Sequence, residues 1–159
     1  MPFDATHMIW PWLFPFTYVV HMAEEYWGGD GYSAYLSRTK GVDLTSARFL
    51  LLTALGLVLM VAGIPLAGMF RFPQLLLVIL GTLVLVNGVS HGVSSVVTAR
   101  YNPGLISGIL IWIPLGVITL AQLRDRMSAT RYLTAVAIGV SIQALVSLIS
   151  LRGGRLFRA

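Results

Sequence analysis

Charged residues are scarce in this chain: they make up 11% of its 159 residues, whereas 57% are hydrophobic. A soluble domain carries about 25% charged residues, most of them on its surface. The scarcity excludes a water-exposed globular fold and predicts an integral membrane protein. At about 20 apolar residues per transmembrane helix, the chain has room for about five spans. We therefore expect an all-α, polytopic bundle that forms one domain over residues 1–159.

Cysteine is absent. Its absence excludes disulfides, thiolate zinc sites and cysteine nucleophiles, so any metal must be held by nitrogen and oxygen. The net charge of +5 does not indicate a nucleic-acid partner, because the Lys and Arg residues fall at helix ends and in loops without forming a basic run. We expect no nucleic acid to bind.

Long apolar stretches are what the chain has instead. Five are long enough to cross a hydrocarbon core of roughly 30 Å: Met8–Trp27, Ser46–Met69, Gln74–Thr98, Pro103–Leu123 and Tyr132–Leu151. The polar stretch 28–45, between the first two, is expected to hold a short interfacial helix.

The distribution of basic residues predicts the orientation. Seven fall on one side of the five spans: Arg38, Lys40, Arg48, Arg100, Arg152, Arg155 and Arg158. Four fall on the other: Arg71, Arg124, Arg126 and Arg131. Because cytoplasmic loops carry the excess of Lys and Arg, we expect the N-terminus outside and the C-terminus in the cytoplasm.

The first span carries three ionisable residues within five positions, His21, Glu24 and Glu25. A charged group at the centre of a span costs about 2.5–3.5 kcal/mol on insertion scales, so such groups are rare without a function. Positions i, i+3 and i+4 fall within about 100° on one helix face. We expect all three side chains to point into one interior cavity.

The third span carries a matching polar stripe. Asn87, Ser90, His91 and Ser94 are spaced at i, i+3, i+4 and i+7 and share one face. His21 and His91 each lie about six or seven residues before the end of spans that run in the same direction. At about 1.5 Å per residue, both lie roughly 9–10 Å from the same membrane surface. The two histidines are therefore expected at one level.

This set of residues predicts a metal site. His21, Glu25 and His91 match a catalytic zinc site that keeps one position open, and Glu24 is expected to act as the general base. Asn87 is expected as an added ligand when the metal is iron. The spacing is similar to the metalloprotease pattern H-x-x-E-H. A non-haem iron site with two histidines and one carboxylate stays an alternative. We expect a divalent metal as cofactor, with zinc preferred over iron.

The loop after the third span emerges on the same side and is a candidate lid. Arg100, Tyr101 and Asn102 in this loop, together with Ser94, are expected to contact substrate. Ser107, one turn into the fourth span, is a further polar group that can line the cavity. Two simpler interpretations stay open: solvated glutamates near the interface, and hydrogen bonding between helices through His91, worth about 0.6 kcal/mol per contact.

The chain resembles the HXXEE family of small integral membrane proteins. The motif is present as His21-Met22-Ala23-Glu24-Glu25. Three further pieces agree with the resemblance: Trp12-Leu13-Phe14-Pro15, the pair Asn87 and His91, and Tyr101-Asn102-Pro103-Gly104. Because the family's function is unknown, the resemblance names no substrate. It implies that His21, Glu24, Glu25, Asn87 and His91 form a functional set.

Three classes of function compete for these residues. The first is a metal-dependent enzyme on a lipid or other hydrophobic small-molecule substrate, with hydrolysis preferred over oxidation. The second is a metal-free acid/base isomerase or lipid-binding protein of the sterol isomerase type. The third is a proton- or cation-coupled carrier, which five short spans support poorly unless the chain forms a homo-oligomer. The sequence leaves the oligomeric state open.

Overall fold

The computed structural model describes residues 9–42 and 44–156, of which 153–156 are described by their backbone alone. Met8 and Arg158, which enter the predictions above, lie outside the described residues, as does the side chain of Arg155. The elements are, in order, η1 (Trp10–Trp12), α2 (Leu13–Trp27), α3 (Tyr32–Lys40), α4 (Ser46–Met69), α5 (Pro73–Thr98), α6 (Leu105–Ser107), η2 (Gly108–Trp112), α7 (Ile113–Leu123) and α8 (Ala129–Leu156). The described part of the chain contains no strand, so the expected all-α fold is confirmed.

Four helical segments are long and apolar enough to cross a membrane: α4, α5, the continuous segment α6–η2–α7, and α8. This is consistent with an integral membrane protein. The fifth expected span differs, because η1 and α2 together cover only 18 residues from Trp10 to Trp27. At 1.5 Å per residue they extend about 27 Å. The structure thus has four long apolar helices and a shorter one that carries the charged motif.

Two helix boundaries have clear local causes. Pro73 is the first residue of α5, where its missing N–H costs no helical hydrogen bond. The fourth span begins at Leu105 rather than at the expected Pro103, because Gly104 adopts a left-handed conformation with φ of 96°. This conformation suits glycine. The loop before α6 therefore ends at Gly104 and not at the expected Asn102.

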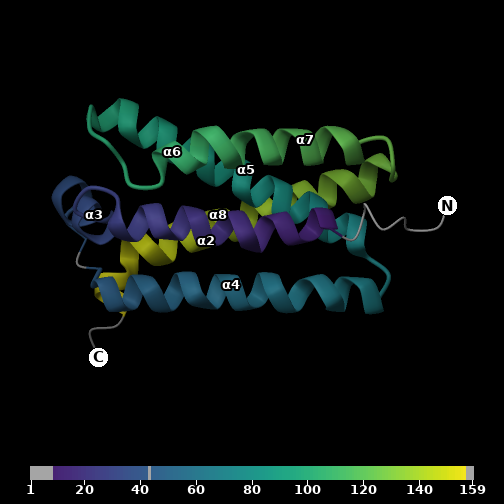
Figure 1. Cartoon of the computed structure of the whole chain (residues 1–159), viewed down its shortest axis with the longest axis horizontal. Coiled ribbons are helices and arrows are strands. Elements are labelled where there is room, and N and C mark those ends of the chain that lie inside the picture. Colours follow the sequence, from purple (N-terminus) through teal and green to yellow (C-terminus); the bar gives the residue numbers. More distant parts are fainter. Residues whose placement is uncertain (1–8, 43, 157–159) are drawn as a thin grey trace.

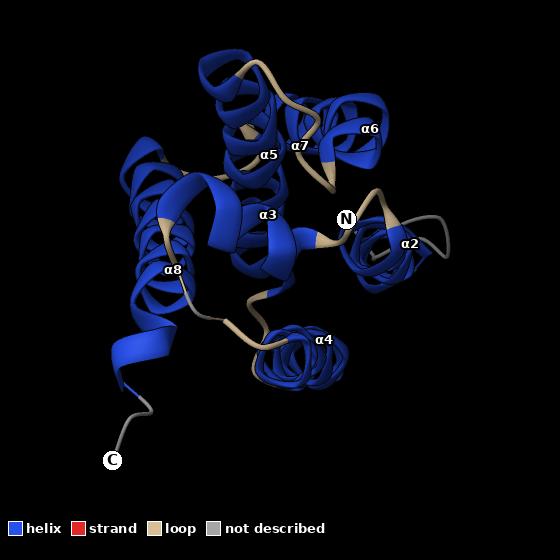
Figure 2. Ribbon diagram, turned by 90° about the vertical axis from the view of Figure 1, so that its left-hand side faces the viewer, coloured by secondary structure: helices blue, strands red, loops and turns tan. Residues whose placement is uncertain are grey.

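Helix α5 is the centre of the bundle. It packs against α7 on one side and α8 on another, and it also contacts α4 (Figures 1 and 2). The main core cluster includes Phe14 of α2, Val78 and Val84 of α5, and Trp112 of η2, all nearly inaccessible. Helix α4 lies at the edge of the bundle in Figure 2 and contacts α2 more than α5.

Helix α3 lies across one end of the bundle, where α2 and α5 end (Figures 1 and 2). It confirms the short helix expected between residues 28 and 45. Its Tyr35 hydroxyl lies 3.2 Å from Oγ1 of Thr98 at the end of α5, and Leu36 and Phe49 form a small separate core with it. Helix α3 thus covers the end of the bundle that contains the candidate site.

A pair of glycines brings α5 against the start of the fourth span. A Cβ atom on Gly88 would lie 2.7 Å from the main-chain oxygen of Gly108, closer than two such atoms approach each other. Only a residue without a side chain allows this approach. The contact places Ser107 beside the histidines of α2 and α5.

Candidate metal centre

Three buried side chains from two helices converge at one point. His21 and Glu25 lie one turn apart on α2, and His91 faces them from α5. One ligand atom from each side chain lies within 4.8 Å of the other two. Oε1 of Glu25 is 3.3 Å from Nε2 of His91 and 3.7 Å from Nε2 of His21. The predicted proximity of the two histidines is confirmed, with ring centroids 5.0 Å apart.

These distances fit a shared metal ion, although the 3.3 Å contact between Glu25 and His91 is also within hydrogen-bond distance. Metal–ligand bonds of about 2.0–2.1 Å at a tetrahedral angle put neighbouring ligand atoms roughly 3.3–3.4 Å apart. The separation of 3.3 Å equals this spacing, and the separation of 3.7 Å slightly exceeds it. A hydrogen bond at 3.7 Å is too long to count as one, and Nε2 of His21 has no hydrogen-bond partner among the described residues.

A hydrogen-bond chain fixes the tautomer of His21. Nδ1 of His21 lies 2.7 Å from Oγ of Ser107. The single hydroxyl proton of Ser107 is already donated to a carboxylate oxygen of Glu24. Oγ must therefore accept a hydrogen bond from Nδ1–H, so the second ring nitrogen, Nε2, keeps a free lone pair that faces Glu25 and His91. Histidines that bind metals characteristically donate their second ring N–H in this way.

Glu24 lies outside the group of three ligand atoms. Its two oxygens accept four hydrogen bonds, and the donors are the Tyr101 hydroxyl, the N–H of Ile106, and the N–H and hydroxyl of Ser107. A carboxyl group that only accepts from four donors is ionised. Glu24 therefore attaches the start of the fourth span to α2. Glu24 is thus linked to His21 through Ser107 and contributes none of the three ligand atoms.

The divergence of Glu24 and Glu25 follows from helix geometry. Successive residues of an α-helix are rotated by about 100°, so Glu25 turns toward the two histidines while Glu24 turns toward α6. Their burial differs accordingly: Glu25 is buried and Glu24 is half-buried. The motif H-x-x-E-E thus places Glu25 among the ligand atoms and Glu24 against Ser107, which bonds His21.

Trp112 forms the wall behind His21. The two rings are stacked with centroids 3.6 Å apart. Trp112 ends the π-helical turn η2, and it also stacks on Tyr18. A π-helical turn inserts an extra residue into a helix and is frequent at functional sites. Stacking and the bond to Ser107 together restrict the orientation of the imidazole.

Gly104 covers the two histidines from the loop side. A Cβ atom there would lie 2.6 Å from Cε1 of His91 and 2.9 Å from Cε1 of His21. Its backbone conformation, with φ of 96°, also excludes most other residues. The loop predicted as a lid therefore lies directly over the imidazole rings.

The remaining predicted residues fall into two groups. Asn87 and Asn102 are in the buried region, and the side-chain oxygen of each has no hydrogen-bond partner in the described part of the chain. Two further buried atoms there also lack a partner, Nδ1 of His91 and the indole N–H of Trp112. Arg100 is exposed, whereas Ser94 is half-buried near α3 and its carbonyl accepts a hydrogen bond from Thr98. The buried polar atoms are acceptors and donors available to a bound group.

Tyr101 contacts this site through its hydroxyl, which donates a hydrogen bond to Oε1 of Glu24 at 2.7 Å. Partial burial and the hydrogen bond to the Glu24 carboxylate raise the pKa of Tyr101 to about 12. The phenol therefore stays protonated at neutral pH and serves as a donor. Tyr101 contacts the supporting carboxylate rather than the three ligand atoms.

Sequence reasoning missed Trp112, and also Tyr32 of α3, whose ring centroid lies 5.5 Å from that of His91. A tryptophan within an apolar span is indistinguishable from a lipid-facing one, and no periodicity marks a π-helical turn. Ser107 was recognised as a polar group near the cavity, but its bond to His21 depends on the close approach of Gly88 and Gly108.

The family model described as "Protein of unknown function with HXXEE motif" matches residues 12–119. This match covers most of the chain and includes every residue of the candidate metal centre, so the chain belongs to this family. No curated protein and no solved structure matches the chain.

Proposed function

We propose that this member of the HXXEE family is a metal-dependent membrane enzyme that hydrolyses a lipid or another hydrophobic substrate. The observation that carries the proposal is the convergence of one atom each from His21, Glu25 and His91 within 4.8 Å in a buried position. Two imidazoles and a carboxylate are the donor set of catalytic zinc sites that keep an open position. Zinc is the preferred ion, and non-haem iron is the alternative that the same donors allow.

The hydrophobic surroundings support a substrate from the bilayer. The ligand atoms lie in a bundle whose outer surface exposes large apolar side chains along α2, α4, α5 and α7. A divalent metal supplies Lewis acidity and lowers the pKa of a bound water. In this proposal His21, Glu25 and His91 are the ligands, and Gly104 and its loop exclude bulk water from them. The side-chain oxygens of Asn87 and Asn102 are polar contacts for a bound group.

Glu24 has two candidate roles in this proposal. As the general base, it would accept a proton from water. As a positioning residue, it would hold His21 in its ligating tautomer through Ser107. The four hydrogen bonds that Glu24 accepts favour the positioning role, since they occupy the lone pairs that a base needs.

Elemental analysis of the purified protein tests the metal. We expect about one zinc or iron per chain, and loss of the metal in His21→Ala and Glu25→Gln, because each variant removes a ligand. Ser90→Ala is a matched control, since Ser90 is exposed and its hydroxyl bonds its own helix. A wild-type protein free of zinc, iron and manganese, whose properties do not change in His21→Ala, contradicts the proposal.

Isotope labelling tests the reaction class. Incubation of the protein with a membrane lipid extract in water enriched in ¹⁸O, followed by mass spectrometry, detects hydrolysis as label in a released acid or alcohol. We expect labelled product that disappears after chelation. Product that forms without label and survives chelators favours the metal-free acid/base isomerase, in which Glu25 and the two histidines move a proton.

A further inference from the structure

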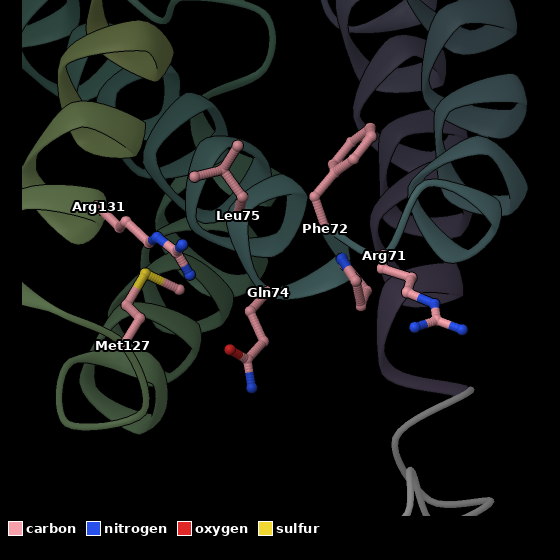
Figure 3. A pocket seen from close by; sticks show the side chains of 7 residues that line it. Arg71, Phe72, Gln74, Leu75, Met127 and Arg131 are labelled. Carbon is pink, nitrogen blue, oxygen red and sulfur yellow. The ribbon is translucent and has the colours of Figure 1, made fainter.

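A cavity lies at the opposite end of the bundle from the candidate metal centre. It is located between the turn that joins α4 to α5 and the connection that joins α7 to α8, and its volume is about 480 Å³ (Figure 3). Small-molecule sites have volumes of roughly 300–1,000 Å³. Its lining includes the side chains of Arg71, Phe72, Gln74, Leu75, Met127 and Arg131.

The polar side of this cavity is positively charged. Arg71 and Arg131 lie on opposite sides of it, and Gln74 lies between them (Figure 3). Both arginines are exposed, and within residues 9–42 and 44–156 neither forms an ion pair. Asp125 is the single acidic residue in the two connections, which also contain Arg124 and Arg126. This end of the bundle therefore has uncompensated positive charge.

The cavity also has an apolar side. Phe72, Leu75 and Met127 contribute to its lining. The cavity lies where long apolar helices end, which in a bilayer is the level of the lipid headgroups. Just beside it, Met69 and Phe70 are about three-quarters and two-thirds exposed. A ligand that fits must be anionic at one end and apolar at the other.

We propose that this cavity binds the headgroup of an anionic phospholipid. The guanidinium group of Arg131 and the amide of Gln74 are hydrogen-bond donors for a phosphodiester, and guanidinium pairs with phosphate in bidentate geometry. The side chain of Arg71 is directed away from Gln74 in Figure 3, but it is exposed and adds positive charge at the rim of the cavity. The acyl chains then lie along the apolar side chains at the end of α4. The proposal is independent of any chemistry at the metal centre.

Native mass spectrometry of the full-length protein in a neutral detergent tests the proposal. Phosphatidylglycerol and phosphatidylcholine with the same acyl chains are titrated separately. We expect preferential retention of phosphatidylglycerol, because only this lipid has net negative charge. Loss of a direct charge-assisted contact to the headgroup is expected to weaken binding at least about fivefold, so the double variant Arg71→Gln/Arg131→Gln is expected to lose roughly 25-fold.

The matched control is Arg124→Gln/Arg126→Gln, which removes the same charge from the same end but leaves the lining of the cavity intact. We expect it to lose less than threefold. Equal losses in both double variants, or equal retention of the two lipids, would overturn the proposal. Displacement of phosphatidylglycerol by an equal concentration of inorganic phosphate would also overturn it, since the acyl chains would then contribute nothing.

Discussion

Helices α4 and α5 are both uninterrupted apolar spans, of 24 and 26 residues, but the protein uses them differently. In the most apolar stretch of α5, 44% of residues are buried, against 11% in α4. Helix α4 is the more apolar of the two. Apolarity thus places a helix in the bilayer but does not place it in the core of the bundle.

The difference arises from small and polar residues. A Cβ atom on Gly81 would lie 3.2 Å from Thr119 of α7, and one on Gly88 would lie 2.7 Å from Gly108. On α4, Gly68 faces open space, and Gly56 approaches only the end of a side chain, the Tyr18 hydroxyl at 2.6 Å from its would-be Cβ, and not a neighbouring backbone. Because lipid is as apolar as leucine, helices in a membrane associate through close packing and polar contacts. The same positions that let α5 pack also bring His91 to α2.

The largest expected effect is on bound metal, when the imidazole of His91 on α5 is removed. His91→Ala is expected to reduce bound metal from about one ion per chain to background, because it removes a ligand whose role no neighbour can take over. Thr53→Ala on α4 is the matched control, since the Thr53 hydroxyl bonds carbonyls of its own helix. Elemental analysis of both variants checks the prediction. Equal metal content in the two variants contradicts the assignment of the site to α5.

The glycines provide the next test. Gly88→Ala is expected to destabilise the fold by about 1–3 kcal/mol, because its Cβ overlaps a main-chain atom of the neighbouring segment. Gly68→Ala on α4 meets no atom and should change stability by less than about 0.5 kcal/mol. Thermal unfolding in detergent, followed by tryptophan fluorescence, measures both. Similar melting temperatures for the two variants would show that α5 does not depend on close packing.

Much of this contrast is visible in the sequence, and some of it is not. The bounds of α4 agree with the predicted Ser46–Met69, since polar residues or a turn flank the apolar run on both sides. The i, i+4 spacing of His21 and Glu25, and the equal depth of His21 and His91, also lead to the observed cluster. The separation of Glu24 from Glu25 is predictable from the 100° rotation per residue, although proximity in sequence favoured one cavity.

The unpredicted parts depend on tertiary contacts. No local pattern shows that Trp112 stacks on His21, because the contact requires the π-helical turn and the approach of η2 to α2. The role of Ser107 likewise depends on which helices are neighbours. The orientation of the termini and the single-domain boundary stay predictions from charge and length.

The hydrogen bonds from His21 to Ser107 and from Ser107 to Glu24 connect the site to the segment that packs on α5. Ser107→Ala and Glu24→Gln are each expected to weaken metal binding by about 10- to 100-fold, as loss of a hydrogen bond to a ligating histidine typically does. Ser90→Ala on the exposed side of α5 should bind metal normally. Metal affinity is measured by competition with a chelator of known affinity. If Glu24→Gln abolishes activity while metal affinity stays unchanged, Glu24 is the general base and not a positioning residue.

The smallest expected effect concerns the loop over the site. Tyr101→Phe removes one of the four hydrogen bonds to Glu24 and is expected to lower stability by about 0.5–1.5 kcal/mol. Tyr26→Phe on the exposed face of α2 is the control. Because the pKa of Tyr101 is raised from 10.0 to about 12, its contribution is fully present below pH 10 and is lost as the pH rises through 12. A difference between wild type and Tyr101→Phe that disappears already at neutral pH would show that the phenol does not support Glu24.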